Sequence, residues 1–332
     1  MYATAEGTAR YTAKHPQFRD AGFYRTVLGL RLSTLGIGTY LGAVDDAADR
    51  AYTEALLAAG EGGINFFDTA INYRQQRSER AIGAALRQLQ RDEVVICTKA
   101  GFLTPGAVPD SLGAADVVGR MHSMAPLFLA DQAARSRDNL RVDTIDVLYL
   151  HNPETQLGFV PKPEFYERIR RAFALLERLA DEETIRWYGV ATWDGLRKGA
   201  LSLEKLAAIA AEEGGAEHRF RFVQLPFNLA MTEAFDGGAA SILQTAARLG
   251  VAVVASASLL QTRVLGHMPE SLAQALPGCE SEAQRAIQFT RSTPGITVAL
   301  VGMGRREHVE QNLKVARVPP ATPQEYARLY QR

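Results

Sequence analysis

Short apolar runs recur along the chain and alternate with longer segments of helical period. Within each run, polar residues rarely alternate with apolar ones, which is typical of strands buried on both faces, as in a parallel sheet. The runs occupy residues 32–38, 64–67, 94–97, 145–150, 186–190, 221–225, 251–255 and 297–301. We therefore expect eight strands of this kind.

The segments between the runs have the spacing of amphipathic helices. Phe165, Ile169, Phe173, Leu176 and Leu179 recur every three or four residues and so fall on one face of a helix. The same pattern predicts helices over residues 47–59, 79–89, 203–213, 241–249, 282–291 and 308–316.

Alternation of strands and helices predicts β-α-β units with right-handed crossovers. Eight units of about 40 residues would fill the chain, so a closed (β/α)8 TIM barrel fits better than a two-domain dinucleotide-binding enzyme. Residues 23–28 and 30–35, joined at Gly29, predict a β-hairpin that caps the barrel bottom. We expect residues 1–22 to be an N-terminal extension without an assignable role, and residues 23–332 to be a single domain.

Composition removes several classes of function. The 37 Lys and Arg residues balance the 37 Asp and Glu residues, which argues against a nucleic-acid partner. No apolar run reaches the length of about 18 residues that a membrane helix needs, and the N-terminus lacks the apolar stretch of a signal peptide. Two cysteines, Cys97 and Cys279, exclude a disulfide scaffold. We expect a cytoplasmic protein without a membrane partner.

Polar residues end four of the predicted strands: Asp68, Lys99, His151 and Gln224. Taken singly, each has a structural explanation, such as a helix cap or a core histidine. In barrel enzymes, however, the carboxyl ends of the strands carry the active site. Four such residues facing one mouth therefore predict a catalytic site.

Other chemistries lack their motifs. The histidines include no pair at metal-ligand spacing, so no metal site is expected. Neither a nucleophile elbow nor a phosphate-binding loop of the Walker type is present. Gly36, Gly38 and Gly42 narrowly miss the dinucleotide fingerprint and more plausibly mark the turn after the first strand.

Four separated motifs, in order, resemble the aldo/keto reductase family. They are NFFDTAINYRQQRSERAIGAAL, ICTKAGF, DVLYLHNPE and ALVGMGRREHVEQNLKVA, within residues 23–316. The resemblance implies a barrel that binds a nicotinamide cofactor without a Rossmann fold. It also implies a catalytic set made of Asp68, Tyr73, Lys99 and His151.

These four residue types suit carbonyl reduction. A carbonyl that receives a hydride at carbon needs a proton at oxygen, and the Tyr73 hydroxyl holds one at neutral pH. A lysine ammonium stabilises the phenolate and so lowers the tyrosine pKa towards the working pH. Asp68 keeps Lys99 charged and in place, and His151 donates a hydrogen bond to the carbonyl oxygen.

The resemblance assigns cofactor contacts to further residues. It places Gly38, Thr39 and Tyr40 near the pyrophosphate or nicotinamide ribose, and Gln224 on the carboxamide. It also makes the N-terminus of the helix that follows Gly302 and Gly304 a binding site for an anionic group of the cofactor. Gln311 and Asn312 are placed on the adenine.

The chain departs from the family pattern where nicotinamide is held. Ala191 and Thr192 stand where the family usually has Ser-Asn, and Ser256 stands where it usually has a stacking aromatic ring. We expect Gln224 to hold nicotinamide for the most part, with Thr192 beside it. Trp193 is a nearby aromatic candidate for the missing ring.

Arg305 and Arg306 bear on the choice of cofactor. The 2′-phosphate of NADPH needs cationic donors, and an arginine fork supplies two hydrogen bonds at once. Because these arginines open the last barrel helix, NADPH is favoured over NADH. The alternative is that both are solvated residues of a first helical turn.

We thus expect an enzyme that reduces small-molecule aldehydes or ketones with NAD(P)H. The alternatives are a cofactor-binding regulatory subunit, like the potassium-channel β subunits, and an unrelated barrel lyase. Residues 102–124, 152–162 and the tail after Pro319 are expected to build the substrate pocket. Neither the substrate nor the oligomeric state follows from the sequence.

Overall fold

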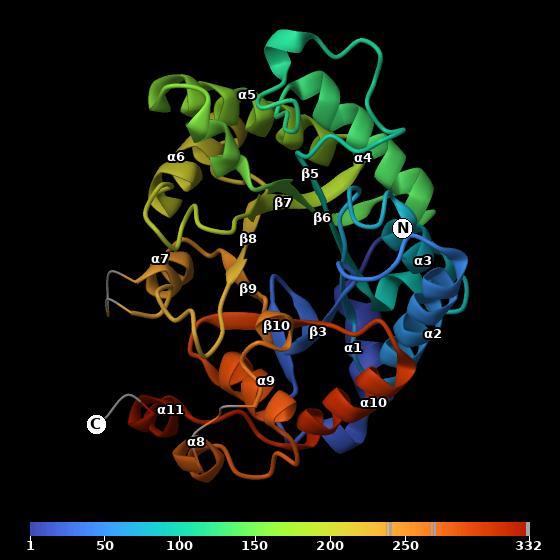
Figure 1. Ribbon diagram of the computed structural model, residues 1–332, viewed down its shortest axis with the longest axis vertical. Helices are drawn as coiled ribbons and strands as arrows, with labels where there is room; N and C mark the ends of the chain where they lie inside the picture. Colours follow the sequence, from blue (N-terminus) through green and yellow to red (C-terminus); the bar gives the residue numbers. More distant parts are fainter. Residues whose placement is uncertain (237, 239–240, 267, 269, 330–332) are drawn as a thin grey trace.

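Eight parallel strands close into a barrel with helices around it (Figure 1). The computed structural model describes residues 1–332 other than 237, 239–240, 267, 269 and 330–332. The barrel strands are β3 (Leu35–Gly38), β4 (Phe66–Asp68), β5 (Val95–Ala100), β6 (Ile145–His151), β7 (Ile185–Ala191), β8 (Phe220–Pro226), β9 (Ala252–Ser256) and β10 (Ile296–Gly302). β10 pairs with β3 and closes the ring, so the predicted (β/α)8 fold is confirmed.

The outer helices alternate with the strands, and all of those given next were predicted except α4. They are α2 (Asp46–Gly62), α3 (Arg77–Ala85), α4 (Pro126–Leu140), α5 (Lys162–Asp181), α6 (Leu203–Gly214), α7 (Ile242–Arg248), α9 (Glu282–Ser292) and α10 (Arg306–Leu313). Local signals set their ends: the Asp45 side chain caps α2 by accepting from the Ala48 amide, and Gly63 ends that helix with a φ of 117°.

Apolar side chains fill two layers, one inside the barrel and one between strands and helices. In β6, Val147 and Tyr149 point inward, whereas Leu148 and Leu150 pack against the helices. Both faces of the strand are therefore buried, which explains the continuous apolar run in its sequence. The predicted face of α5, from Phe165 to Leu179, is buried in the outer layer.

The bottom of the barrel is covered by the N-terminal part of the chain. The predicted hairpin is present as β1 (Tyr24–Val27) and β2 (Leu30–Ser33), and Leu30 and Leu32 reach into the barrel interior. The structure divides the predicted run 32–38 at Thr34, so that Ser33 ends the hairpin and Leu35 begins the barrel strand.

The residues before the hairpin also form part of this floor. The Ala3 amide donates to Asp146 Oδ1 at 2.8 Å, and Arg186 donates to the Ala3 carbonyl. Helix α1 (Ala5–Ala13) follows, capped by the Thr4 side chain. Gly7 of this helix lies against η2 (Arg91–Glu93), where an added Cβ would lie 2.1 Å from the Asp92 carbonyl oxygen.

Two further short helices lie towards the C-terminus, α8 (Glu270–Ala275) and α11 (Pro323–Arg328). Over the described residues, no helix combines the length and apolarity needed to cross a bilayer.

Candidate active site

A cavity of about 760 Å³ opens at the carboxyl ends of the barrel strands. Its wall includes the ends of β3, β4, β6, β7, β8, β9 and β10, together with Phe102 just after β5. The volume lies in the range of about 300–1,000 Å³ that is usual for small-molecule sites. All four predicted strand-end residues belong to this end of the barrel, and three of them, Asp68, His151 and Gln224, line the cavity.

Asp68 is held by two donors inside the barrel mouth. Lys99 Nζ donates to Asp68 Oδ1 at 2.5 Å and to the Thr69 carbonyl at 2.7 Å. Gln224 Nε2 donates to Asp68 Oδ2 at 2.7 Å. Because Asp68 and Lys99 are buried, this hydrogen-bonded ion pair fixes both side chains. The pairing of Asp68 with Lys99 was expected from the sequence, whereas the bond from Gln224 was not.

Tyr73 lies on the loop after β4, beside the lysine. Lys99 Nζ is 4.9 Å from the centre of the Tyr73 ring. The loop is anchored because Arg74 Nε donates to the Ala43 carbonyl at 2.7 Å. Arg74, Gln75 and Gln76 all have positive φ, a strained conformation for non-glycine residues that is concentrated at functional sites.

His151 is fixed through its own backbone. The carbonyl of His151 accepts from His122 Nε2 at 2.8 Å, and His122 Nδ1 is 3.2 Å from Gln156 Nε2. A carbonyl can only accept, so the proton of His122 is on Nε2 and Nδ1 accepts from Gln156. The His151 ring meets Tyr73 edge-on, with the ring centres 5.8 Å apart, and Phe102 in the same way at 5.0 Å.

Burial and charge shift the pKa values of this group. Burial raises the pKa of Asp68, and Lys99 and Gln224 oppose that rise. Burial lowers the pKa of Lys99, but Asp68 and Tyr73 outweigh this effect and raise it, so the lysine stays cationic. Burial, together with the nearby Lys99 and His122, lowers the pKa of His151 well below its ordinary value, so its ring is neutral.

The tyrosine departs from the expectation. Burial raises the pKa of Tyr73 above its ordinary value, while the charge and hydrogen bond of Lys99 act in the opposite direction. The lysine therefore has the predicted sign of effect, but burial outweighs it. At neutral pH the hydroxyl holds its proton and is an acid rather than a base.

Six predicted cofactor residues line the cavity: Gly38, Thr39, Tyr40, Thr192, Gln224 and Gly302. Thr192 is buried, and its Oγ1 has no hydrogen-bond partner among the described residues. A buried hydroxyl without a partner is costly unless a ligand satisfies it. Thr39 is less available, because its hydroxyl donates to the Asp68 carbonyl and its own carbonyl accepts from Ser78.

Comparison with known proteins identifies the family to which the chain belongs. A model of the aldo/keto reductase family matches residues 34–331. The chain belongs to the aldo/keto reductase family. Two curated relatives are a D-threo-aldose 1-dehydrogenase from a Pseudomonas species, 31% identical over 176 residues, and an NADH-specific methylglyoxal reductase from Escherichia coli, 30% identical over 172 residues. Each alignment covers half of the relative, and 49% and 50% of this chain, respectively.

Solved structures share the whole barrel. An aldo/keto reductase from Klebsiella pneumoniae in complex with NADP and acetate has a TM-score of 0.66 at 20% identity, covering 91% of this chain and 92% of that one. A glycerol dehydrogenase from Gluconobacter oxydans has a TM-score of 0.69 at 21% identity, covering 94% and 95%. At these identities the likeness shows the fold.

Five of the predicted cofactor residues lie outside the cavity wall, at or along α10: Gly304, Arg305, Arg306, Gln311 and Asn312. As predicted, the helix begins at the arginine pair, with Arg305 as N-cap and Arg306 next. Both arginines are exposed, and Arg306 Nε donates to Glu310 Oε1 at 2.8 Å. Asn312 is buried, and the Gln311 side chain is exposed.

The cavity wall differs from the segments expected to build the substrate pocket. Of the segments predicted to build it, only Phe102 and Asn152 line the cavity, and the described residues after Pro319 do not. The segment after β9, from Ala257 to Arg263, lines it instead. Ala257, Leu260, Gln261 and Thr262 have positive φ. This turn carries no glycine, so the sequence held no signal for it.

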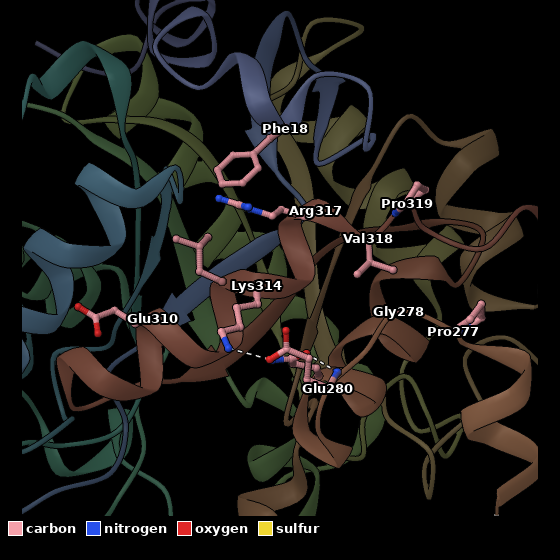
Figure 2. Close-up of a pocket in the computed structure, with 11 residues that line it drawn as sticks. Phe18, Pro277, Gly278, Glu280, Glu310, Lys314, Arg317, Val318 and Pro319 are labelled. Atoms are coloured by element: carbon pink, nitrogen blue, oxygen red, sulfur yellow. Dashed lines mark hydrogen bonds and ion pairs between the residues drawn. The ribbon is translucent and has the colours of Figure 1, made fainter.

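A second hollow, of about 860 Å³, lies on the outer surface (Figure 2). Phe18, α10, η7 (Lys314–Arg317) and the segment before α9 surround it. Lys314 and Glu280 form an exposed ion pair across its wall. None of the predicted site residues lines this hollow. Among the described residues, no three His, Cys, Asp or Glu side chains form a metal-binding group.

Proposed function

We propose that this protein reduces an aldehyde or ketone to an alcohol with a reduced nicotinamide cofactor. The observation that carries the proposal is the linked set of Asp68, Lys99, Tyr73 and His151 at the mouth of the cavity. Two relatives are named as a methylglyoxal reductase and an aldose dehydrogenase, which supports chemistry between a carbonyl and an alcohol.

The cavity has groups that suit the cofactor. The unpartnered Thr192 hydroxyl and the Gln224 amide oxygen suit a nicotinamide carboxamide, which both donates and accepts hydrogen bonds. Arg263 and the α10 N-terminus suit its phosphates. When bound, a reduced nicotinamide supplies the hydride. Two structural neighbours are titled as complexes with NADP and NADPH.

The protein's own residues supply the proton that the carbonyl oxygen needs. The Tyr73 hydroxyl gives its proton to the carbonyl oxygen, which becomes the alcohol once hydride has reached carbon. The nearby Lys99 ammonium stabilises the phenolate that remains until solvent reprotonates it. Neutral His151 donates a hydrogen bond to the carbonyl oxygen and orients the substrate. Asp68 keeps Lys99 charged and in place.

We also propose a preference for NADPH over NADH. Arg305 and Arg306 are exposed at the start of α10, where they are available to a 2′-phosphate. The Arg306–Glu310 pair is solvent-exposed, so a phosphate displaces it at little energetic cost. The NADH-specific relative makes the preference a point to be measured for this chain.

The decisive test is Tyr73→Phe, assayed with a generic aldehyde and each reduced cofactor. Reduction should fall by about 10²–10⁴-fold, the usual contribution of a general acid, while cofactor binding persists. Near-normal turnover in the variant would contradict the proposal.

A second candidate function is that of a cofactor-binding regulatory subunit. It is favoured by a relative named as a probable voltage-gated potassium channel subunit beta from Arabidopsis thaliana, 31% identical over 128 residues, which cover 38% of this chain and 35% of that protein. Wild-type protein that binds cofactor but reduces no carbonyl compound would support it. Membership of the family already removes the unrelated barrel lyase.

A further inference from the structure

Aromatic and apolar side chains flank the cavity mouth from opposite sides. Trp193, 43% exposed, follows β7, whereas Tyr40 and Leu41, 56% and 52% exposed, follow β3. β3 and β7 are four strands apart in the eight-stranded ring, and so face each other across it. All three side chains line the cavity, and the Tyr40 ring packs against the Tyr73 ring at 4.8 Å between centres. The space between these two sides is called the slot below, and its sides are called the Trp193 wall and the Tyr40 wall; Tyr73 lies beside the Tyr40 wall.

The Trp193 wall is held by a single carboxylate. Glu154, on η4 (Pro153–Gly158) after β6, accepts with Oε1 from the amides of Trp193 at 2.7 Å and of Asp194 and Gly195 at 3.2 Å each. Burial raises the pKa of Glu154, and the three consecutive amides oppose that rise. They therefore favour the ionised carboxylate, to which hydrogen bonds are stronger than to a neutral group. These three hydrogen bonds fix the backbone that carries the Trp193 indole.

The loop around this carboxylate is tightly packed. A Cβ on Gly195 would lie 3.1 Å from Glu154 Cδ and 2.8 Å from Leu201 Cδ1. Glu154 Oε2 is buried without a partner among the described residues. The hydrogen bonds from Trp193, Asp194 and Gly195 are therefore all accepted by Oε1. The carboxylate therefore cannot shift without moving the Trp193 segment.

The charges around the slot restrict its ligand. Among the described residues that line the cavity, the ionised side chains are Asp68, which Lys99 neutralises, and Arg263, which lies beyond β9. Neither belongs to the Tyr40 or the Trp193 wall. An ionised substrate would lose its hydration there without gaining a partner, whereas an uncharged aromatic one would gain apolar contact with the exposed ring of Trp193 or of Tyr40.

We propose that Glu154 is a positioning residue, which fixes Trp193 as one wall of a slot that favours uncharged aromatic carbonyl compounds. This proposal rests on the carbonyl reduction proposed above. Glu154 does not touch the substrate, so its loss should change discrimination between substrates and the mobility of Trp193, rather than the chemistry itself.

The first measurement needs no turnover. The chain has two tryptophans, and Trp187 is 8% exposed, so acrylamide quenching of fluorescence reports mainly on Trp193. Glu154→Ala should increase the quenching constant and lower the anisotropy. Glu154→Gln keeps an accepting oxygen and should lie between wild type and Glu154→Ala.

The second measurement compares benzaldehyde with propanal in kcat/KM. Glu154→Ala should lower kcat/KM for benzaldehyde by about tenfold, the size expected for one lost aromatic contact, and should leave propanal within about twofold. Trp193→Ala should likewise lower the ratio of benzaldehyde to propanal. Gly195→Ala, whose added Cβ would lie 3.1 Å from Glu154 Cδ, should lower the same ratio. Gly158→Ala is the matched control, because its added Cβ meets nothing within 4 Å.

The outcomes separate the two proposals. If wild type reduces neither aldehyde, the proposed function fails, and the quenching data still decide whether Glu154 holds Trp193. If wild type reduces both aldehydes, the slot proposal is overturned by any of three results: unchanged quenching in Glu154→Ala, an equal loss for both aldehydes, or a weaker cofactor affinity that accounts for the loss.

Discussion

Lys99 donates to the buried carboxylate of Asp68 and also lies beside the Tyr73 ring. Lys99→Met removes the ammonium that opposes the burial-raised pKa of Tyr73. We expect a strong loss of reduction rate, and the high-pH limb of the pH–rate profile should move to higher pH, because the acid loses its proton later. A profile identical to that of wild type would contradict the electrostatic role. Lys314→Met, which alters an exposed ion pair, is the control.

His122 gives stability a defined pH dependence. Burial lowers its pKa from 6.5 to about 4 in the folded protein. Between these values the unfolded chain binds a proton that the folded chain does not, so the free energy of unfolding falls as the pH drops from 6.5 to 4. The His122 share is on the order of 3 kcal/mol. Urea titrations at several pH values should show that the free energy of unfolding of His122→Gln depends less steeply on pH than that of wild type. An equally steep dependence would mean that other groups cause it.

At the scale of elements, α1 is held to the barrel by close backbone packing. Gly7→Ala places a methyl group 2.1 Å from the Asp92 carbonyl oxygen, so the helix must move away from η2. We expect the free energy of unfolding to fall by about 1–3 kcal/mol, as in other overpacked sites, with little change in turnover because the cavity lies at the opposite end of the barrel. Denaturant unfolding measures this. A loss no larger than that of Gly158→Ala would contradict it.

The strands were predictable, whereas several helices were not. Strands buried on both faces leave continuous apolar runs, and all eight were found from them. Helix α4 buries Gln132 and Ser136 beside Phe128, which breaks the apolar period. Helix α1 was missed because its buried positions include Gly7 and Thr8.

The candidate site was also predictable only in part. Asp68, Lys99 and His151 end buried strands, so the sequence places them at one mouth. Tyr73, from the adjoining loop, came from the family motif. Contacts between loops distant in sequence, such as Glu154 with the Trp193 amide, leave no local pattern and needed the structure.

For the whole molecule, cofactor binding should appear as thermal stability. A ligand at 100 times its Kd stabilises the folded state by about 2.7 kcal/mol. At equal concentrations NADPH should raise Tm more than NADH does, and Arg305→Ala with Arg306→Ala should remove the difference. Equal shifts in wild type would contradict the preference. Arg87→Ala, an exposed arginine beyond the end of α3, is the control.

The hydrogen bonds of Ala3 at the bottom of the barrel can form only after distant parts of the chain have been synthesised. Ala3 binds Asp146 and Arg186, which follow it by 143 and 183 residues. At about 5–20 residues per second, the ribosome adds Arg186 roughly 10–40 s after Ala3. Ala3 can therefore take its place on the barrel floor only after these partners have been synthesised. A nascent chain stalled before β7 would lack a closed floor and would be a target for chaperones.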